Sequence, residues 1–262
     1  MPAPRPVALV TGASAGIGRE LARILAREGH DLVLVARREP ELIALAAEVK
    51  ERYGADSRVI TSDLSKARAA QTLVKELGPS AQVDVLVNNA GFGGHGAFWE
   101  RERDADLRQI AVNVTALTDL TRLLLPGMVE RRRGRILNVA STAAFQPGPF
   151  MAVYYATKAY VLSFSQALAE ELSGTGVTVT TLCPGVTETE FQRVAGVEDV
   201  PLTKGPLSMT AEAVAEAAYK GMARGRLLVV PGVHNKVGAQ ATRFTPRRVI
   251  LKVVRRLHPT DH

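Results

Sequence analysis

Short runs of Val, Leu and Ile alternate along this chain with longer stretches in which apolar residues recur at helical spacing. The apolar runs lack the polar alternation of half-exposed strands, which is typical of parallel strands buried on both faces. The expected strands are residues 7–11, 32–36, 58–62, 83–88, 135–140, 177–183 and 227–230, and the expected helices are residues 16–28, 39–53, 66–77, 105–130, 155–172 and 211–223. Such units are joined by right-handed crossovers, so the pattern predicts a doubly wound, seven-stranded parallel α/β sheet with helices on both faces.

The length of the chain and the lack of an obvious linker predict a single domain over residues 1–262. Residues 187–210 contain prolines and glycines without clear periodicity, and we expect them to form a substrate loop over the site. Residues 243–262 are expected to form a basic helical tail. This tail places four apolar residues on one helical face: Val249, Ile250, Val253 and Leu257. The face predicts a helix packed on its own subunit or on a partner subunit, and the alternative is a contact with a membrane surface.

The formal net charge of +7 is compatible with an anionic partner, but no nucleic-acid recognition motif accompanies it. We therefore expect an enzyme with an anionic ligand and no nucleic-acid partner. The single cysteine, Cys183, excludes an internal disulfide and is expected to be an inert buried residue. Together with the lack of an apolar signal region it predicts a cytoplasmic location. No membrane span and no metal site are expected.

Three glycines, Gly12, Gly16 and Gly18, lie between the first expected strand and the first expected helix, together with Ser14 and Ile17. Glycine permits a tight turn and lets backbone N–H groups approach a pyrophosphate, while the helix points its positive end at that charge. The spacing is Gly-x-x-x-Gly-x-Gly instead of the commoner Gly-x-Gly-x-x-Gly. The turn predicts a dinucleotide site, and the alternative is a tight turn without a ligand.

The second expected strand ends at Ala36, followed by Arg37 and Arg38. An acidic residue at this point would hydrogen-bond the ribose hydroxyls of NAD. Here alanine takes that place, and an arginine fork pairs well with phosphate oxygens. We therefore expect NADP, with Arg37 as the main partner of the 2′-phosphate, Ser14 assisting and Arg38 contributing. The alternative is that both arginines belong to a solvent-exposed loop.

Tyr154 and Lys158 are four residues apart in an expected helix and therefore share one face of it. A free tyrosine has a pKa of about 10 and is a poor base at neutral pH. A neighbouring ammonium group and the positive charge of an oxidised nicotinamide both stabilise its anion. The pair therefore predicts proton transfer by Tyr154. Tyr155 and Tyr160 are excluded because neither has a lysine four residues further on.

Ser141 closes the fifth expected strand, where its hydroxyl can donate to a carbonyl oxygen as negative charge develops. Thr142 is expected to point the other way on an extended strand. Asn113 lies inside an expected helix, where asparagine is a poor helix former and needs a compensating role. Taken alone, Asp63, at the end of the third strand, is suited to be the N-cap before Lys66, where the next helix is expected to begin.

These motifs, in this order and spacing, resemble the short-chain dehydrogenase/reductase family over roughly residues 5–230. The resemblance includes Asn-Asn-Ala-Gly at residues 88–91, Ser141 located 13 residues before Tyr154, and Asn113 located 28 residues before Ser141. The pattern is similar to the ketoacyl-reductase and hydroxysteroid-dehydrogenase side of the family. The resemblance implies a single-domain Rossmann fold, NADP(H) as cofactor, and a homodimer or homotetramer formed through the helices at 105–130 and 155–172.

The resemblance also assigns roles to individual residues. Lys158 would hold the nicotinamide ribose, and Asn113 would hold a water that links Lys158 to solvent. Asp63 and Leu64 would line the adenine pocket. The other residues expected at the cofactor are Asn89, Ala90 and Gly91 beside the central strands, Pro184 and Gly185 under the nicotinamide, and Thr187 and Thr189 at the carboxamide and pyrophosphate.

The whole constellation predicts a reversible, NADP-dependent ketone reductase in which Tyr154 donates the proton and Ser141 polarises the carbonyl. The residues expected around the substrate are Ser141, Phe92, His95, Phe145, Phe150 and Phe191. They indicate a roomy apolar site for a bulky or acyl-chain ketone. The alternative is an NADP-binding regulatory or scaffold protein with a vestigial site.

Overall fold

The computed structural model describes residues 4–78, 81–198, 200 and 208–259. In this part of the chain seven parallel strands form one sheet in the order β3-β2-β1-β4-β5-β6-β9. The strands are β1 (Val7–Thr11), β2 (Asp31–Ala36), β3 (Ser57–Thr61), β4 (Val85–Asn88), β5 (Gly134–Val139), β6 (Val177–Leu182) and β9 (Leu228–Val229). The chain adds strands outward from β1 to β3 on one side and from β4 to β9 on the other. The predicted doubly wound sheet is therefore confirmed.

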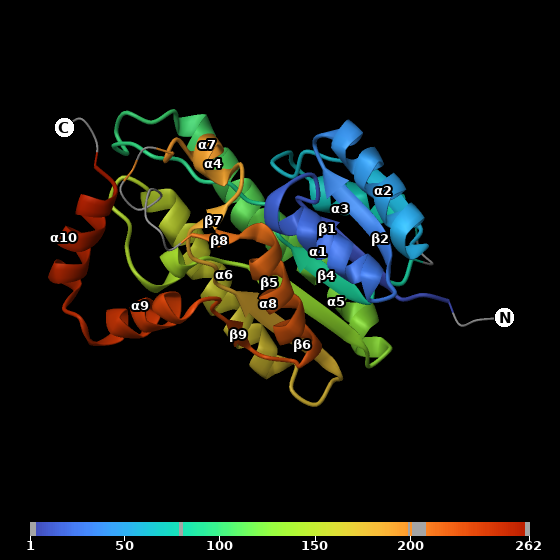
Figure 1. Cartoon of the computed structure of the whole chain (residues 1–262). Helices are drawn as coiled ribbons and strands as arrows, with labels where there is room; N and C mark the ends of the chain where they lie inside the picture. The colour runs from blue at the N-terminus through green and yellow to red at the C-terminus, as the bar shows by residue number, and fades with distance from the viewer. Residues whose placement is uncertain (1–3, 79–80, 199, 201–207, 260–262) are drawn as a thin grey trace.

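Helices cover both faces of the sheet, as Figure 1 shows. Alternate residues of β1 point to opposite sides, so that Ala8 and Val10 belong to one apolar core and Leu9 to the other. The first core includes residues of α1 (Gly16–Arg27), α2 (Glu39–Tyr53) and α8 (Ala211–Ala223), and the second includes residues of α3 (Ala69–Leu77), α5 (Leu117–Glu130) and α6 (Ala152–Glu171). Both faces of β1, β2, β4, β5 and β6 are largely buried, which explains why their sequences lack polar alternation. The edge strand β3 is partly exposed.

The long helix expected at residues 105–130 consists of three helical segments. α4 (Arg103–Ile110) continues into the π-helical segment η1 (Ala111–Ala116), which leads into α5. Asn113 lies in η1 and is buried. A π-helical turn is uncommon and occurs frequently at functional sites. Here it places Asn113 within hydrogen-bond distance of the loop after β4.

The helix expected from residue 66 begins three residues later, at Ala69, after a left-handed residue at Arg68. Asp63 does not cap this helix. Its carboxylate accepts hydrogen bonds from the backbone N–H and the hydroxyl of Ser65, which close a turn directly after β3. The capping alternative for Asp63 is therefore wrong.

The expectation that Thr142 lies on an extended strand is also wrong. β5 ends at Val139, and Thr142 begins the short 3₁₀ helix η2 (Thr142–Phe145). Ser141 caps η2 because its hydroxyl oxygen accepts a hydrogen bond from the N–H of Ala143. The direction of the Ser141 side chain is thus set by the start of this helix.

The expected substrate loop 187–210 contains secondary structure that its sequence pattern does not predict. β7 (Thr187–Glu188) pairs in parallel with β8 (Met209–Thr210), and α7 (Phe191–Ala195) follows β7. Residues 199 and 201–207 of this loop lie outside the described residues. The segment after β6 is therefore tied to the start of α8, and several of its residues from Thr187 to Val197 contribute to the wall of the cavity described below.

The expected basic tail begins at the last residues of α9 (Val233–Phe244) and continues into α10 (Arg247–Leu257). The two helices lie along one end of the molecule (Figure 1). Ile250 and Val254 of α10 are buried in a cluster with residues of α6 and α7, which confirms that this helix packs on its own subunit. Val249 and Val253, expected on the same face, are 47% and 49% exposed. The membrane alternative stays a prediction for this outward side. Within the described residues, no helix combines the length and the apolarity needed to cross a bilayer.

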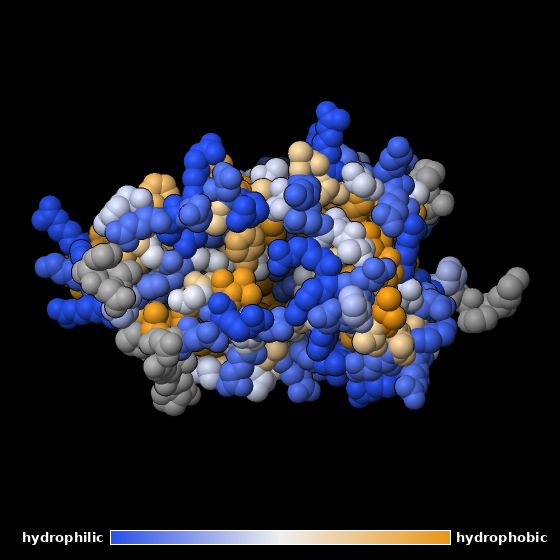
Figure 2. Space-filling model, turned by 90° about the horizontal axis from the view of Figure 1, so that it is seen from above, coloured by the Kyte–Doolittle hydropathy of each residue, from blue (hydrophilic) through white to orange (hydrophobic). Residues whose placement is uncertain are grey.

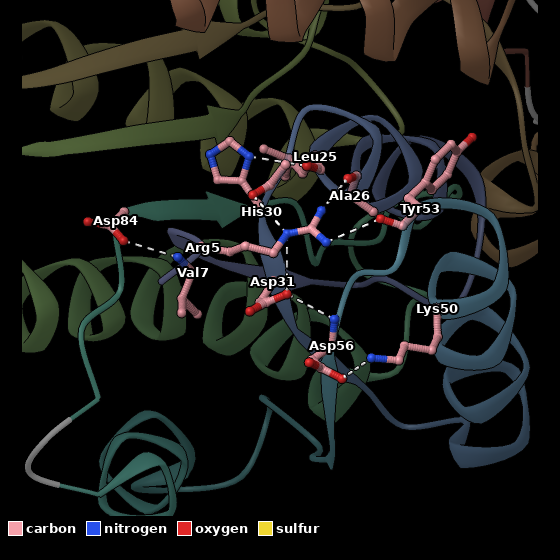
Figure 3. A network of polar contacts seen from close by, with 11 residues as sticks. Arg5, Val7, Leu25, Ala26, His30, Asp31, Lys50, Tyr53, Asp56 and Asp84 are labelled. Carbon is pink, nitrogen blue, oxygen red and sulfur yellow. Dashed lines mark hydrogen bonds and ion pairs between the residues drawn. The ribbon is translucent and has the colours of Figure 1, made fainter. Parts of the chain in front are cut away.

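Polar contacts at the amino-terminal edge of the sheet join strand starts to helix ends (Figure 3). The Arg5 guanidinium donates hydrogen bonds to the carbonyl oxygens of Ala26, Gly29 and Tyr53, at the carboxyl ends of α1 and α2. The position suits a cation because helix carboxyl ends carry partial negative charge. This edge is occupied by such internal contacts, whereas the loops at the opposite edge are the ones that bind ligands in folds of this kind.

A buried amide network joins the two central strands to the helices that cover them. The Asn88 side chain on β4 donates to Thr121 Oγ1 at 3.0 Å and to Asn138 Oδ1 at 2.9 Å. Asn138 on β5 in turn donates to Ser165 Oγ of α6 at 2.9 Å. Polar groups buried at this depth are stable only when they are paired, so these four side chains depend on one another.

We expect Asn138→Ala to lower the free energy of unfolding by about 1–3 kcal/mol, because it removes an acceptor from Asn88 and a donor from Ser165. Chemical denaturation followed by circular dichroism measures the change. Arg135→Ala, an exposed position on the same strand, is the matched control and should change the free energy by less than about 0.5 kcal/mol. Equal effects at the two positions would contradict the stabilising role of the network.

Candidate active site

A cavity of about 600 Å³ opens at the carboxyl edge of the sheet, where the loops after β1, β2, β3, β4 and β5 converge. Figure 2 looks onto this edge and shows a hollow near the middle of the face, bordered by both hydrophobic and hydrophilic surface. In open α/β sheets, ligands bind beside the point where the strand order reverses. β1 and β4 are neighbours at that point. The cavity thus occupies the place that the fold predicts for a dinucleotide.

The turn between β1 and α1 tolerates only glycine at its closest contacts. Gly12 and Gly16 have φ values of +67° and +52°, and a Cβ on Gly18 would collide with the carbonyl oxygen of Gly12 and the side chain of Asn89. α1 follows Ala15 without a side-chain cap, which leaves its first N–H groups available to an anion. The turn therefore fits the pyrophosphate of a dinucleotide.

Nearly all the residues expected at the cofactor line the cavity: Gly12, Ser14, Gly16, Ile17, Arg37, Arg38, Asp63, Leu64, Asn89, Ala90, Gly91, Tyr154, Lys158, Pro184, Gly185, Thr187 and Thr189. Gly18 is the exception. It lies behind the turn, where its lack of a side chain permits the close contact with Gly12 and Asn89. The structure therefore gives Gly18 a packing role, and its contact with the cofactor stays a prediction.

Two arginines stand at the end of the cavity next to β2. An Nη of Arg38 lies 3.3 Å from Ser14 Oγ and 2.9 Å from the carboxylate of Glu190. Its hydrogen bond lowers the pKa of Glu190. Arg37 is exposed at the cavity wall. Both guanidinium groups line the cavity, and that of Arg38 already pairs with one carboxylate, so this end of the cavity suits an anionic group of a ligand.

The three side chains expected to perform proton transfer meet at the middle of the cavity. Tyr154 and Lys158 lie on α6, 9% and 5% exposed, with Lys158 Nζ 5.8 Å from the centre of the Tyr154 ring. The Ser141 hydroxyl lies near the Tyr154 hydroxyl and favours its ionised form, while its own hydrogen-bond partners are the N–H of Ala143 and the carbonyl oxygen of Pro184. Lys158 Nζ donates to the carbonyl oxygen of Val139 at 2.8 Å. The structure therefore brings together the residues that the sequence separated by up to 17 positions.

Burial controls the charges of this group. It raises the pKa of Tyr154 to about 12, an effect that the nearby Ser141 side chain partly offsets. It also lowers the pKa of Lys158 to about 8. Desolvation disfavours the charged form of each group. In the protein alone, the pKa of the tyrosine is therefore raised by burial, whereas the spacing of the two residues predicts that it is lowered.

Asn113 holds the loop after β4 instead of lining the cavity. Its Nδ2 donates to the carbonyl oxygen of Phe92 and to Thr157 Oγ1, both at 3.0 Å, and its Oδ1 accepts from the N–H of Phe92 at 3.1 Å. A Cβ on Gly91 would lie 3.1 Å from Asn113 Oδ1 and 3.4 Å from Lys158 Nζ. Asn113 thus positions the backbone next to Lys158. Its role in holding a water stays a prediction.

The structure places only some of the expected substrate residues at the cavity. Phe92, Phe191 and Ser141 line the cavity, whereas His95, Phe145 and Phe150 do not. Phe145 packs in a separate core cluster with Cys183 and Val230. His95 and Phe150 contact each other edge to face at 6.5 Å. These residues lie away from the cavity because of their local backbone. Phe145 ends η2 and packs in the core, and Phe150 has a left-handed backbone with φ of +65°.

Sequence reasoning missed one wall of the cavity. Val254, Leu257 and His258, in or directly after α10, line it together with Met151 and Val197. The apolar face of the tail was the only signal for this contact, and that signal does not say which part of the chain the helix covers.

Cys183 also lies near the site but is fully buried, and burial raises the pKa of its thiol to about 12, as expected for an inert residue.

A family model described as short chain dehydrogenase matches residues 6–198 of this chain. A very-long-chain 3-oxoacyl-CoA reductase of Laccaria bicolor is 43% identical over 177 residues, which cover 66% of this chain and 52% of the relative. This chain spans 52–60% of the length of the first curated relatives that it matches.

Solved structures match over nearly the whole chain. A short-chain dehydrogenase from Sphingobium yanoikuyae in complex with NADPH is 34% identical, with a TM-score of 0.82 and coverage of 98% of this chain and 99% of that chain. A bulky-bulky ketone specific alcohol dehydrogenase from Comamonas testosteroni is 30% identical, with a TM-score of 0.79 and coverage of 98% and 97%. A Burkholderia phymatum short chain dehydrogenase/reductase in complex with NAD is 26% identical, with a TM-score of 0.81 and coverage of 90% and 92%.

We expect Gly18→Ala to weaken the binding of a nicotinamide dinucleotide by about tenfold or more, because the added methyl group forces the turn away from Asn89. Titration of the fluorescence of the reduced cofactor measures this affinity. Gly238→Ala is the matched control, since a Cβ there meets nothing within 4 Å. Unchanged affinity in a folded Gly18→Ala protein would contradict the assignment of the turn.

Proposed function

Since this chain belongs to the short chain dehydrogenase family, whose members are oxidoreductases, we propose that it reduces a ketone reversibly to a secondary alcohol with NADP(H). The ketone is bulky and apolar or carried on an acyl chain. The observation that carries the proposal is the meeting of Ser141, Tyr154 and Lys158 in the cavity that also contains the glycine turn. The names of the Laccaria and Comamonas proteins support a ketone of this class.

Each protein side chain has a defined part in the reduction. When bound, NADPH supplies the hydride. The Tyr154 hydroxyl donates its proton to the carbonyl oxygen, and the Ser141 hydroxyl donates a hydrogen bond to the same oxygen as negative charge develops. The ammonium of Lys158 stabilises the tyrosinate that remains. Asn113 acts on this group indirectly, because it bonds the backbone of Phe92, the residue after Gly91.

The raised pKa of Tyr154 supports reduction as the working direction. With a pKa of about 12, the phenol is protonated at neutral pH and can act as the acid. Alcohol oxidation needs the tyrosinate instead, which burial disfavours until a positive charge arrives beside it.

Three observations support NADP over NAD. Ala36 stands where an acidic residue would select NAD. Arg37 and Arg38 both line the cavity, and Arg38 lies against Ser14, so guanidinium groups that can pair with a 2′-phosphate are present. The Sphingobium structure, with NADPH bound, matches over almost the full chain.

The alternative, a regulatory or scaffold protein with a vestigial site, is disfavoured because Ser141, Tyr154 and Lys158 are all present and share one cavity. Detectable ketone reduction would exclude the vestigial alternative.

We further propose a cytoplasmic homodimer or homotetramer. The exposed apolar side chains of Leu107 and Ile110 on α4 and of Leu123 on α5 support an interface through these helices.

Tyr154→Phe is expected to lower the turnover of ketones by about 10²–10⁴-fold, because the proton donor is removed. Loss of NADPH absorbance over a panel of bulky and acyl-chain ketones measures turnover. NADPH binding, measured by fluorescence, should persist. Tyr160→Phe is the matched control because its hydroxyl contacts Thr118 outside the cavity. Full activity of Tyr154→Phe would overturn the mechanism.

The removal of either cation, by Arg37→Ala or Arg38→Ala, should raise the KM for NADPH by about tenfold to a hundredfold and leave the KM for NADH nearly unchanged. The range follows from the value of a hydrogen bond to a charged group. Arg52→Ala, an exposed arginine of α2 outside the cavity, serves as the control. A preference of the unaltered protein for NADH would overturn the assignment of NADP.

A further inference from the structure

The chain returns to the cavity at its last helix and adds a polar corner there. His258, directly after α10, and Tyr155 of α6 both line the cavity. His258 is 2% and Tyr155 is 6% exposed, and His258 Nε2 lies 2.9 Å from the Tyr155 hydroxyl. The two residues are 103 positions apart in the sequence. Neither has a part in the proton transfer proposed above.

Hydrogen-bonding capacity is left over in this corner. His258 Nδ1 is buried and has no partner among the described residues, and the same holds for Nε2 of His95, whose ring centre is 6.2 Å from that of His258. Burial lowers the pKa of His258 to about 4, so its ring is neutral at pH 7. A neutral imidazole has one donor and one acceptor nitrogen. Leaving a buried polar nitrogen unpaired is unfavourable, which makes it a strong site for a complementary ligand group.

The polar corner is adjacent to the reacting tyrosine and surrounded by apolar surface. The Tyr155 ring lies 6.0 Å from that of Tyr154 and 5.9 Å from that of His258. Met151, Val197 and Val254 belong to the same apolar cluster as the two tyrosines, and Leu257 also lines the cavity. A molecule whose carbonyl group lies at Tyr154 therefore has an apolar wall beside it. The polar corner formed by Tyr155 and His258 lies beyond this carbonyl, because the Tyr155 ring stands between those of Tyr154 and His258.

The orientation of Tyr155 is determined by its surroundings. A Cβ on Gly148 would collide with its ring, and its hydroxyl has His258 as partner. Both groups of the corner are thus held in place before a ligand arrives, which reduces the entropy lost on binding.

We propose that Tyr155 and His258 form a subsite for an uncharged hydroxyl or second carbonyl group of the substrate, remote from the ketone that is reduced. Val254 and Leu257 of α10 contact the apolar part of the substrate that lies between its ketone and its second polar group. This inference rests on the proposed ketone reduction and narrows its substrate class to bulky ketones with a second, neutral polar group.

The test compares two ketones with the same bulky skeleton, one with a remote hydroxyl group and one without it. The unaltered protein should favour the hydroxylated ketone in kcat/KM by about tenfold or more, because a site built to hydrogen-bond a group discriminates against its absence. His258→Phe, which keeps the ring volume, and Tyr155→Phe, which removes one oxygen, should each reduce this ratio toward one, mainly through KM. His234→Phe, at an exposed position of α9, should keep the ratio.

Melting temperature and NADPH binding show whether each variant is folded. A preserved ratio in folded His258→Phe and Tyr155→Phe proteins would overturn the subsite and leave the Tyr155–His258 bond as an anchor for α10 alone. Equal losses of kcat/KM for the two ketones would overturn the subsite as well, because the ratio between them would then be unchanged.

Calorimetric titration of the same two molecules into the protein with NADP⁺ separates this inference from the proposed function. If neither ketone is reduced, the proposed function fails. The subsite is still supported if the hydroxylated molecule binds more tightly and His258→Phe removes the difference, and it is overturned if both bind alike.

Discussion

One buried threonine at the end of β1 joins the two halves of the sheet at the point where the site forms. Thr11 Oγ1 donates to the carbonyl oxygen of Val87 at 3.1 Å and accepts from the N–H groups of Asn89 and Ala90, both at 3.0 Å. The Asn89 side chain donates in return to the Thr11 carbonyl oxygen at 2.9 Å. These bonds hold the glycine turn against the loop after β4, so the dinucleotide cradle and the backbone beside Lys158 both depend on them.

The same enclosure that excludes water from the reaction disfavours the charges that the reaction creates. Tyr154 and Lys158 both have pKa values shifted toward their neutral forms by burial. The Ser141 hydroxyl offsets part of this effect for the tyrosine, and the carbonyl oxygen of Val139 accepts a hydrogen bond from the lysine. A phenol held protonated in this way suits a proton donor, which is the role that ketone reduction requires of it.

The two ends of the cavity are built by different kinds of structure. The cofactor end consists of strand termini and their turns, all within the residues 6–198 that match the family model. The other end is completed by Val254, Leu257 and His258, which lie beyond that match. Functional specificity commonly lies in such segments mounted on a shared fold. The substrate preference of this chain should therefore depend strongly on α10.

The sequence by itself determined what depends on local spacing. Strand and helix positions follow from apolar periodicity, the glycine turn from close backbone contact, and the pairing of Tyr154 with Lys158 from one helical turn. Only the tertiary structure decided the contacts between distant segments. It placed Glu190 on Arg38, turned Phe145 into a core cluster, and brought His258 to Tyr155. A helical face in the sequence shows that α10 must pack, but not what it packs against, because apolar burial has no intrinsic direction or partner.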